Sequence, residues 1–357
     1  MKILVDCREI RKNTTGIARF LLNFFEGLKS FDVNFEFILL GNQHTDFKRK
    51  ELNGYKKVVI EEKNTFYFDQ VVIKNVIKEQ KIDLFFSPYY KFPVFTKIPV
   101  ITSIFDVMYL VLDEYKNDIK NIYRKNFIKL TYKKVKKVIT SSNYTKNEIV
   151  EVLKLPEEKI DVVYLSVDEK FKPQPQQKID EFKRNYGINK NYILYVGNAK
   201  PHKNLSCLLS AWQLVNEEIK KEYVLVLAGV GGNFYKEDKE ILIIPFISEE
   251  ELPILYSAAT VFVFPSLYEG FGLPPLEAMS CGCPVISSFA SSMPEILKDA
   301  CLYFNPYDVK DITIALIKII ENKQLRKELK QKGIQLAKLY TKEEMTKNLI
   351  KVLNNYV

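Results

Sequence analysis

Short runs of apolar residues alternate along the chain with longer segments whose apolar positions recur at helical spacing. This alternation is typical of parallel sheets covered by helices. In the first half, strands are expected at 3–6, 35–40, 58–60, 84–87, 100–105, 138–141 and 162–165, and helices near 16–28, 68–79, 115–135 and 145–153. In the second half, strands are expected at 192–196, 224–228, 242–246, 261–264, 285–287 and 302–304.

A polar segment separates the two series of strands. Residues 168–178 carry two prolines and no apolar periodicity, which indicates a linker. The predicted fold class is α/β, with two parallel-sheet domains facing across a cleft. We expect a first domain over 1–167, a linker and domain start over 168–190, a second domain over 191–340, and a C-terminal helix over 341–357 that can pack back on the first domain.

Charge and composition narrow the range of possible partners. The 357 residues are 47% hydrophobic and carry a net charge of +9, which favours an anionic partner, although a general richness in lysine explains it equally well. No RNA-binding aromatic motif or zinc-finger spacing is present, so anionic lipid or a phosphorylated substrate is favoured over nucleic acid. The two histidines, His44 and His202, argue against a histidine-based zinc hydrolase.

Cysteine usage and the N-terminal pattern predict a cytoplasmic protein. The five cysteines are odd in number and scattered, which indicates buried thiols in a reducing compartment rather than disulfides. The first six residues already have a strand pattern, so no signal peptide is expected there. No apolar run approaches transmembrane length.

The segment 261–279 is the most informative part of the chain. A buried strand is followed by a turn with two glycines and then by a helix that begins near Pro274-Pro275, and Glu269 and Glu277 flank that turn. A helix N-terminus suits a phosphate, whereas ionised carboxylates accept hydrogen bonds from hydroxyl groups. The pattern therefore favours a ligand with both groups, although an ordinary strand–helix unit with two solvated glutamates has the same spacing.

Two further turns could bind anions. Lys200 and Lys203 flank a turn that follows the first strand of the second half and precedes a helix, a placement that suits a diphosphate. Thr14, Thr15 and Gly16 precede a helix after the first strand of the chain. This turn lacks the GxGxxG pattern, so a nicotinamide dinucleotide site is not supported. Solvated lysines and an ordinary helix start remain the alternatives.

The segment 120–137 contains eight basic residues and no acidic residue. Lys125, Lys129 and Lys133 form an i, i+4 stripe on the predicted helix, interleaved with Tyr123, Phe127, Leu130 and Val135. A basic amphipathic helix of this kind can lie on an anionic membrane surface. A solvated face on a lysine-rich protein is the alternative, slightly favoured by the pattern alone.

With these motifs in view, the chain resembles the retaining glycosyltransferases of family 4. Glu269 and Glu277 match that family's E-x7-E motif, and the residues around them over 265–286 follow the family pattern closely. Weaker similarities cover 197–204, 291–295 and several positions of the first half. The resemblance implies the GT-B fold of two Rossmann-like domains, the second of which binds a nucleotide sugar and the first an acceptor.

The resemblance also implies roles for individual residues. Glu269 would bind hydroxyls of the donor sugar, Lys203 the diphosphate and Glu277 the ribose; Glu269 and Lys203 are the candidate catalytic residues. The remaining candidate donor-binding residues are Gly16, Asn198, Lys200, Gly270, Phe271, Gly272 and Leu273, with Phe246 and Ile247 near the base. No metal and no other cofactor is expected.

The implied function is a metal-independent retaining hexosyltransferase of polysaccharide or lipopolysaccharide synthesis. GDP-mannose is weakly favoured as donor over UDP- or dTDP-sugars, and the acceptor would be a glycan or a lipid-linked glycan. An enzyme of this kind could lie on the inner face of the plasma membrane through residues 120–137.

One departure from the family pattern keeps other functions open. The family usually has His-Asp after the strand at 100–104, whereas this chain has Phe105-Asp106 on the candidate acceptor and sugar side. Phenylalanine cannot donate a hydrogen bond to a sugar. A catalytically weak nucleotide-sugar or glycan-binding protein is therefore an alternative, and a nucleotide-sugar epimerase is disfavoured by the scarcity of histidine.

Overall fold

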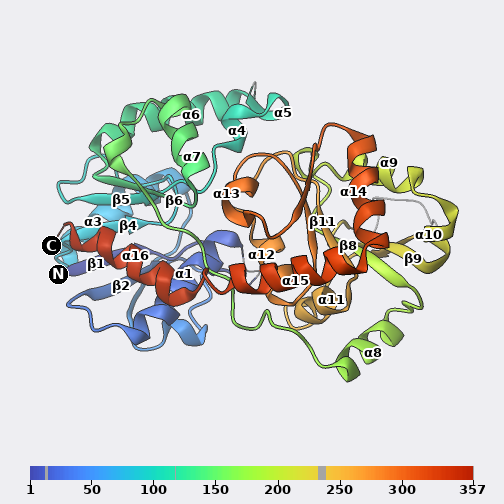
Figure 1. Cartoon of the computed structure of the whole chain (residues 1–357). Coiled ribbons are helices and arrows are strands. Elements are labelled where there is room, and N and C mark those ends of the chain that lie inside the picture. The colour runs from blue at the N-terminus through green and yellow to red at the C-terminus, as the bar shows by residue number, and fades with distance from the viewer. Residues whose placement is uncertain (13–14, 117, 232–238, 357) are drawn as a thin grey trace. The chain divides into compact units, whose positions relative to one another are not determined.

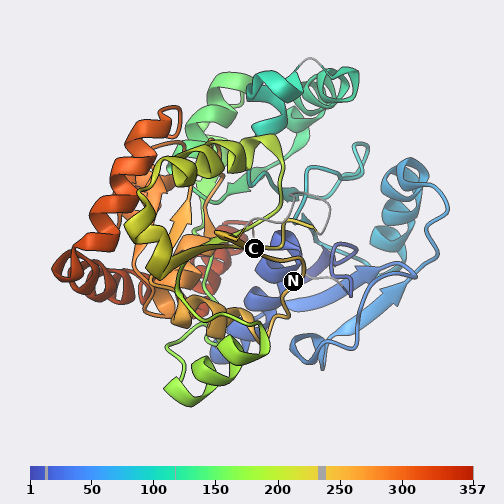
Figure 2. The same cartoon turned by 90° about the vertical axis from the view of Figure 1, so that its right-hand side faces the viewer.

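The chain folds into two compact units. The computed structural model describes residues 1–12, 15–116, 118–231 and 239–356; Thr14 and the side chain of Tyr123 lie outside this description. Unit 1 comprises Met1–Ser166 and Lys342–Val357, and unit 2 comprises Val167–Thr341. Figures 1 and 2 show the elements of each unit from two directions.

A parallel sheet of seven strands forms the centre of unit 1, in the order β3-β2-β1-β4-β5-β6-β7. The strands are β1 (Lys2–Asp6), β2 (Glu36–Gly41), β3 (Lys56–Val59), β4 (Leu84–Ser87), β5 (Val100–Ser103), β6 (Lys137–Thr140) and β7 (Ile160–Val162). Most of these strands are short apolar runs, as expected for a sheet buried on both faces.

Helices cover both faces of this sheet. In β1, Ile3 and Val5 belong to the hydrophobic core on one face and Leu4 to the core on the other, since successive side chains of a strand alternate. The helical segments of unit 1 are α1 (Gly16–Gly27), η1 (Leu28–Ser30), η2 (Lys50–Leu52), α2 (Thr65–Tyr67), η3 (Phe68–Val72), α3 (Ile73–Glu79), α4 (Met108–Val111), α5 (Asp113–Lys116), α6 (Ile119–Thr131), η4 (Tyr132–Lys134), α7 (Asn143–Glu148), η5 (Ile149–Leu153), η6 (Glu157–Lys159) and α16 (Lys342–Asn354).

The last helix of the chain, α16, packs against α1 within unit 1 (Figure 1). Met345, Leu349 and Leu353 of α16 are buried in the same core cluster as the apolar face of α1. A side chain at Gly27, where α1 ends, would clash with Thr346, so the two helices approach closely there. The C-terminal residues thus complete the core of the unit that the N-terminal residues begin.

Unit 2 is built on a second parallel sheet, in the order β10-β9-β8-β11-β12-β13. Its strands are β8 (Asn191–Val196), β9 (Tyr223–Ala228), β10 (Ile241–Ile244), β11 (Val261–Phe264), β12 (Val285–Ser288) and β13 (Leu302–Phe304). Its helical segments are α8 (Gln176–Asn185), η7 (Pro201–Lys203), α9 (Leu205–Leu214), α10 (Glu217–Glu222), α11 (Leu252–Ala258), α12 (Leu273–Ser280), α13 (Met293–Leu297), α14 (Val309–Glu321) and α15 (Lys323–Ala337). The two parallel sheets confirm the predicted α/β class.

Several predicted boundaries were wrong. The segment taken as a linker contains the start of α8, which is polar and buries Phe182. The helix expected over 115–135 is divided into α5, α6 and η4. The helix expected from Thr145 begins at Asn143, because the Ser142 side chain caps it by accepting from the backbone N–H of Thr145.

Candidate functional site

The candidate site of unit 2 lies where two neighbouring strands end. β8 and β11 pair in the sheet, so the loops that follow them leave the same edge. The backbone N–H of Leu267, after β11, donates a hydrogen bond of 2.8 Å to the carbonyl of His202, after β8. The segments that contain Lys203 and Glu269 are therefore joined through their backbones.

Lys203 and Glu269 form an ion pair in this structure. The distance from Lys203 Nζ to Glu269 Oε1 is 2.6 Å, and each side chain is 16% exposed. The ammonium also lies 5.4 Å from the centroid of the Phe264 ring. Partial burial strengthens the attraction between the charges, yet both groups stay accessible to a ligand. A bound diphosphate would compete with Glu269 for the ammonium and leave the carboxylate available to hydroxyl groups.

Two serines after β12 hold the backbone of Glu269. Its N–H donates to Ser291 Oγ at 2.9 Å, and its carbonyl accepts from Ser292 Oγ at 2.9 Å. Both serines lie in the segment 291–295, which resembles the family pattern but to which the resemblance assigned no role. We infer that they fix the orientation of the Glu269 side chain by restricting its backbone.

The N-terminus of α12 follows directly. Gly272 precedes the helix with a φ of +92°, a conformation that favours glycine, and a Cβ at this position would clash with the Met293 side chain. At the start of α12 only the backbone N–H groups of Gly272 and Leu273 can bind an anion, because the next two residues are prolines and have no N–H. Gly270, Phe271 and Leu273 lie in the same turn, as predicted, although phosphate contact there stays a prediction.

Glu277 lies behind this turn, on the second turn of α12. The residue is 3% exposed, and Tyr256 Oη donates a hydrogen bond of 3.3 Å to its Oε2. A carboxylate in such a place is stabilised only by hydrogen bonds or opposite charge, because burial penalises its ionised form. The predicted contact of Glu277 with ribose hydroxyls is therefore confined to the small exposed part of the residue.

Tyr195, on β8, supports the loop that carries the predicted residue Asn198. The Tyr195 hydroxyl donates a hydrogen bond of 2.7 Å to the carbonyl of Asn198. Burial, and after it the negative charge of Glu269, raises the pKa of Tyr195 well above its usual value. The raised pKa keeps the hydroxyl protonated, and therefore able to donate to the loop, at neutral pH.

The other predicted donor residues of unit 2 are more exposed. Phe246 is 78% exposed just after β10, and Ile247 beside it is half-buried. Since β10 is separated from β8 by β9, these residues lie further along the sheet than the ion pair. Asn198 and Lys200 are exposed, and the amide of Lys200 donates to Asn198 Oδ1 at 3.1 Å.

The predicted residues of unit 1 occupy two places. Gly16 opens α1, which Thr15 caps by accepting from the backbone N–H of Ala18. Phe105 packs edge-on against Phe20, with ring centroids 4.9 Å apart. Phe105 and Asp106 line a cavity of about 130 Å³ whose other walls include Tyr89, Tyr90, Tyr109 and Arg124. A sugar contact by Phe105 would be apolar.

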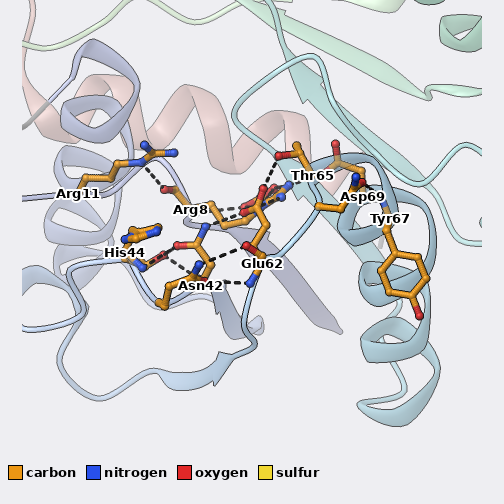
Figure 3. Close-up of polar contacts among 12 residues, drawn as sticks. Arg8, Arg11, Asn42, His44, Glu62, Thr65, Tyr67 and Asp69 are labelled. Atoms are coloured by element: carbon orange, nitrogen blue, oxygen red, sulfur yellow. Dashed lines mark hydrogen bonds and ion pairs between the residues drawn. The ribbon is translucent and has the colours of Figure 1, made fainter.

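Unit 1 also holds a buried charge cluster that sequence patterns did not reveal (Figure 3). Arg8 Nη2 lies 2.7 Å from Asp6 Oδ2 and 2.6 Å from Asp69 Oδ1, and Arg8 Nη1 lies 3.4 Å from Glu62 Oε2. The guanidinium also stacks on the Phe68 ring at 4.4 Å. This cluster joins the end of β1 to the segments that follow β3. Asp69 lies 61 positions after Arg8 in the sequence, and no periodic pattern relates the two segments.

Burial, hydrogen bonds and the charge of Arg8 act in different balance on the two carboxylates Glu62 and Asp69 of this cluster. Burial raises the pKa of Glu62, but hydrogen bonds from Thr65 and Asn42 and the charge of Arg8 outweigh it and lower that pKa overall. For Asp69, burial prevails over the attraction of Arg8, and its pKa is raised. Arg8 is therefore the counter-charge that stabilises the ionised forms of the buried carboxylates.

Both halves of the chain match family models. The model described as "Glycosyl transferases group 1" matches residues 177–336, and the model described as "Glycosyltransferase Family 4" matches residues 14–171. No three histidine, cysteine or acidic side chains converge on a possible metal position within the described ranges, and metal independence stays a prediction.

Relatives and solved structures agree with these matches. The chain is 31% identical over 263 residues to the O-antigen chain mannosyltransferase B of Escherichia coli, which covers 70% of this chain and 68% of that protein. It is 26% identical over 330 residues to the O-antigen chain mannosyltransferase RfbU of Salmonella typhimurium. That alignment covers 86% of this chain and 88% of that protein. Anabaena HepE in complex with UDP-glucose shares the fold, with a TM-score of 0.78, 15% identity and coverage of 99% and 100%.

Proposed function

Because this chain belongs to glycosyltransferase family 4, we propose that it transfers a hexose from a nucleotide sugar to a glycan or lipid-linked acceptor, with retention of configuration at the transferred carbon. Mannose from GDP-mannose is the favoured donor, since two relatives are named as O-antigen mannosyltransferases. A UDP- or dTDP-sugar is the alternative donor. The expected setting is the assembly of a surface polysaccharide or lipopolysaccharide.

The observation that carries this proposal is the Lys203–Glu269 ion pair beside the N-terminus of α12. Lys203 and the backbone N–H groups of Gly272 and Leu273 would stabilise the diphosphate, and Glu269 would accept hydrogen bonds from the sugar. In the proposed step, the bond from the sugar carbon to the diphosphate breaks, and its electron pair goes to the leaving oxygen. The acceptor hydroxyl attacks the same face and gives its proton to that oxygen. Fixed positive groups at the leaving oxygen lower the barrier.

A thermal-shift screen of UDP-, GDP-, ADP-, CMP- and dTDP-sugars tests the donor. A ligand that binds only the folded protein stabilises it by about 2.7 kcal/mol at 100 times its Kd. GDP-mannose is expected to give the largest rise in Tm, and free mannose is the matched control. A larger rise with a UDP- or dTDP-sugar would change the donor, whereas no rise with any nucleotide sugar would refute the proposed function.

Phe105 gives a second candidate function some support. Its ring packs on Phe20 and offers no hydrogen bond to a sugar, which fits a protein that binds a nucleotide sugar but turns it over poorly. Nucleotide release measured with the donor chosen by the screen separates the two functions. Release at the rate of an active transferase excludes the binding protein, and tight binding without release favours it.

We further propose that α6 docks the enzyme on an anionic membrane. Ile119 and Leu130 are 80% and 74% exposed, Ile122 is also exposed, and half-buried Lys125 and Lys129 flank this apolar stripe. An apolar stripe beside cations is typical of a helix lying in a membrane interface. Within the described residues, no helix has both the length and the apolar character needed to cross a bilayer.

Charge reversal of α6 and of the η4 turn that follows it tests the membrane contact. Changing Lys125, Lys129 and Lys133 to glutamate is expected to weaken binding to phosphatidylglycerol vesicles roughly 100-fold or more, since each lysine contributes about 1 kcal/mol near such a surface. Vesicle co-sedimentation measures this binding. The same three changes on α15, at Lys323, Lys327 and Lys330, alter the net charge equally and should leave binding nearly unchanged. Equal loss in both triple variants would contradict a specific surface.

A further inference from the structure

A second, larger cavity of unit 1 adjoins the one that Phe105 and Asp106 line. Its volume is about 300 Å³, and it is bounded by the segment 65–70, by the loop after β4 and by the first turns of α6. Tyr90 and Arg124 line both cavities, so these two side chains stand between them. The larger cavity is therefore next to the predicted acceptor side of unit 1.

Three cations line the larger cavity: Lys91, Lys120 and Arg124. None of them forms an ion pair with a carboxylate in the part of the chain that the structure describes. The one carboxylate of the lining, Asp69, is paired with Arg8 at 2.6 Å. The lining thus carries three cations against one carboxylate, which is already paired with Arg8.

Arg124 is held in place by aromatic rings rather than by an anion. Its guanidinium carbon lies 5.2 Å from the centroid of Tyr90 and 5.3 Å from that of Tyr109. Stacking of this kind orders the guanidinium and leaves its N–H groups available for hydrogen bonds. A planar group with several N–H donors binds phosphate in a bidentate manner.

The rest of the lining is apolar or already hydrogen-bonded. Gln70 donates to the carbonyl of Phe92 at 3.0 Å and accepts from the N–H of Val94 at 3.0 Å, so both ends of its amide already have protein partners. Phe92 is buried, Phe127 is half-buried, and Phe66 is largely exposed. Aromatic surface beside unpaired cations suits a ligand with an apolar chain and an anionic end.

We propose that this cavity binds a phosphate ester of an apolar alcohol, with the phosphate at Lys91, Lys120 and Arg124 and the chain against Phe66 and Phe127. The inference rests on the proposed function in one respect: it assigns the acceptor of that reaction to the class of glycans linked through phosphate to a lipid. The sugar of such an acceptor would extend past Arg124 towards the cavity of Phe105.

Isothermal titration calorimetry of the full chain with dodecyl phosphate, below its micelle concentration, tests the site. Binding to one site is expected, at least tenfold tighter than binding of inorganic phosphate, which lacks the chain, or of octaethylene glycol monododecyl ether, which lacks the charge. Equal affinity for the phosphate ester and the neutral ether would overturn the proposal.

Variants locate the binding. Arg124→Gln and Lys120→Gln are each expected to weaken dodecyl phosphate binding about tenfold, because each removes a charged hydrogen-bond donor. Phe66→Ala should weaken it as well, and since Phe66 is exposed this variant keeps the fold. Lys74→Gln, an exposed change on α3 outside the cavity, is the matched control. Unchanged affinity in Arg124→Gln and Lys120→Gln would refute the site.

A fourth ligand distinguishes a lipid-linked acceptor from a membrane lipid as the source of the phosphate. Dihexanoyl phosphatidylglycerol carries the phosphodiester of a membrane headgroup, and we expect it to bind more weakly than dodecyl phosphate. If it binds more tightly and depends on Arg124, the cavity holds membrane lipid and the acceptor assignment is wrong. These titrations need no donor, so they can succeed where the donor screen fails, and the reverse also holds.

Discussion

Replacement of Lys203 by alanine is expected to lower kcat about 10²- to 10³-fold, the usual loss when one preorganised donor to a developing negative charge is removed. Lys203 is the cation that the structure places against Glu269, at 2.6 Å, beside the first turn of α12. Without it, the charge that forms on the leaving diphosphate would lose the cation closest to Glu269. Steady-state release of the nucleotide measures the effect.

Controls separate this loss from unfolding. Lys178→Ala removes an exposed lysine of α8 in the same unit and should leave turnover unchanged. Glu269→Ala should also lose activity, and the double variant should lose much less than the product of the single losses, because paired residues act together. Turnover of Lys203→Ala within threefold of the unchanged enzyme would refute the assignment of both residues.

Replacement of Arg8 by methionine is expected to cost about 3 to 5 kcal/mol of unfolding free energy, because it leaves buried carboxylates without their counter-charge. Asp6 and Asp69 are each about 5% exposed and both lie within 2.7 Å of the guanidinium. Urea unfolding followed by far-UV circular dichroism measures the loss. The single tryptophan, Trp212, lies in unit 2, so its fluorescence follows that unit separately.

The pH dependence of this variant has a defined sign. The pKa of Asp69 is already raised by burial, and removal of Arg8 raises it further above the value in the unfolded chain. Protonation then favours the folded state, so the deficit should shrink as the pH falls from 7 towards 5. Lys63→Met breaks an exposed pair with Glu61 and should cost less than about 1 kcal/mol at either pH. Equal costs for the two variants would contradict the role of Arg8.

Strands were predicted well because burial on both faces leaves a strong signal. The runs that become β4 and β11 were predicted with their observed bounds. Polar helices were harder to predict from the sequence. α8 follows two prolines and buries little besides Phe182, so composition alone indicated a linker. The start of α7 was misplaced because its cap is Ser142, whose role depends on the local backbone rather than on spacing.

The candidate site likewise contains residues that a local motif identifies and residues that only the fold brings together. Glu269 and Glu277 were identified by a local motif, and pairing of β8 with β11 brings Lys203 to Glu269 across 66 positions of sequence. Ser291 and Ser292 carry no chemical signature of their own, so only the structure reveals their hydrogen bonds to Glu269. The same holds for Arg8, whose partners come from separate loops.

The position of α16 has a consequence for synthesis. Unit 2 is one continuous segment, whereas unit 1 needs Met345, Leu349 and Leu353 from the end of the chain to complete its core. Domains usually fold in the order in which they leave the ribosome. Here that order is reversed, because the unit translated first is completed last. Until α16 emerges, the part of α1 that α16 packs against stays uncovered, so the nascent chain is expected to depend on chaperones late in its synthesis.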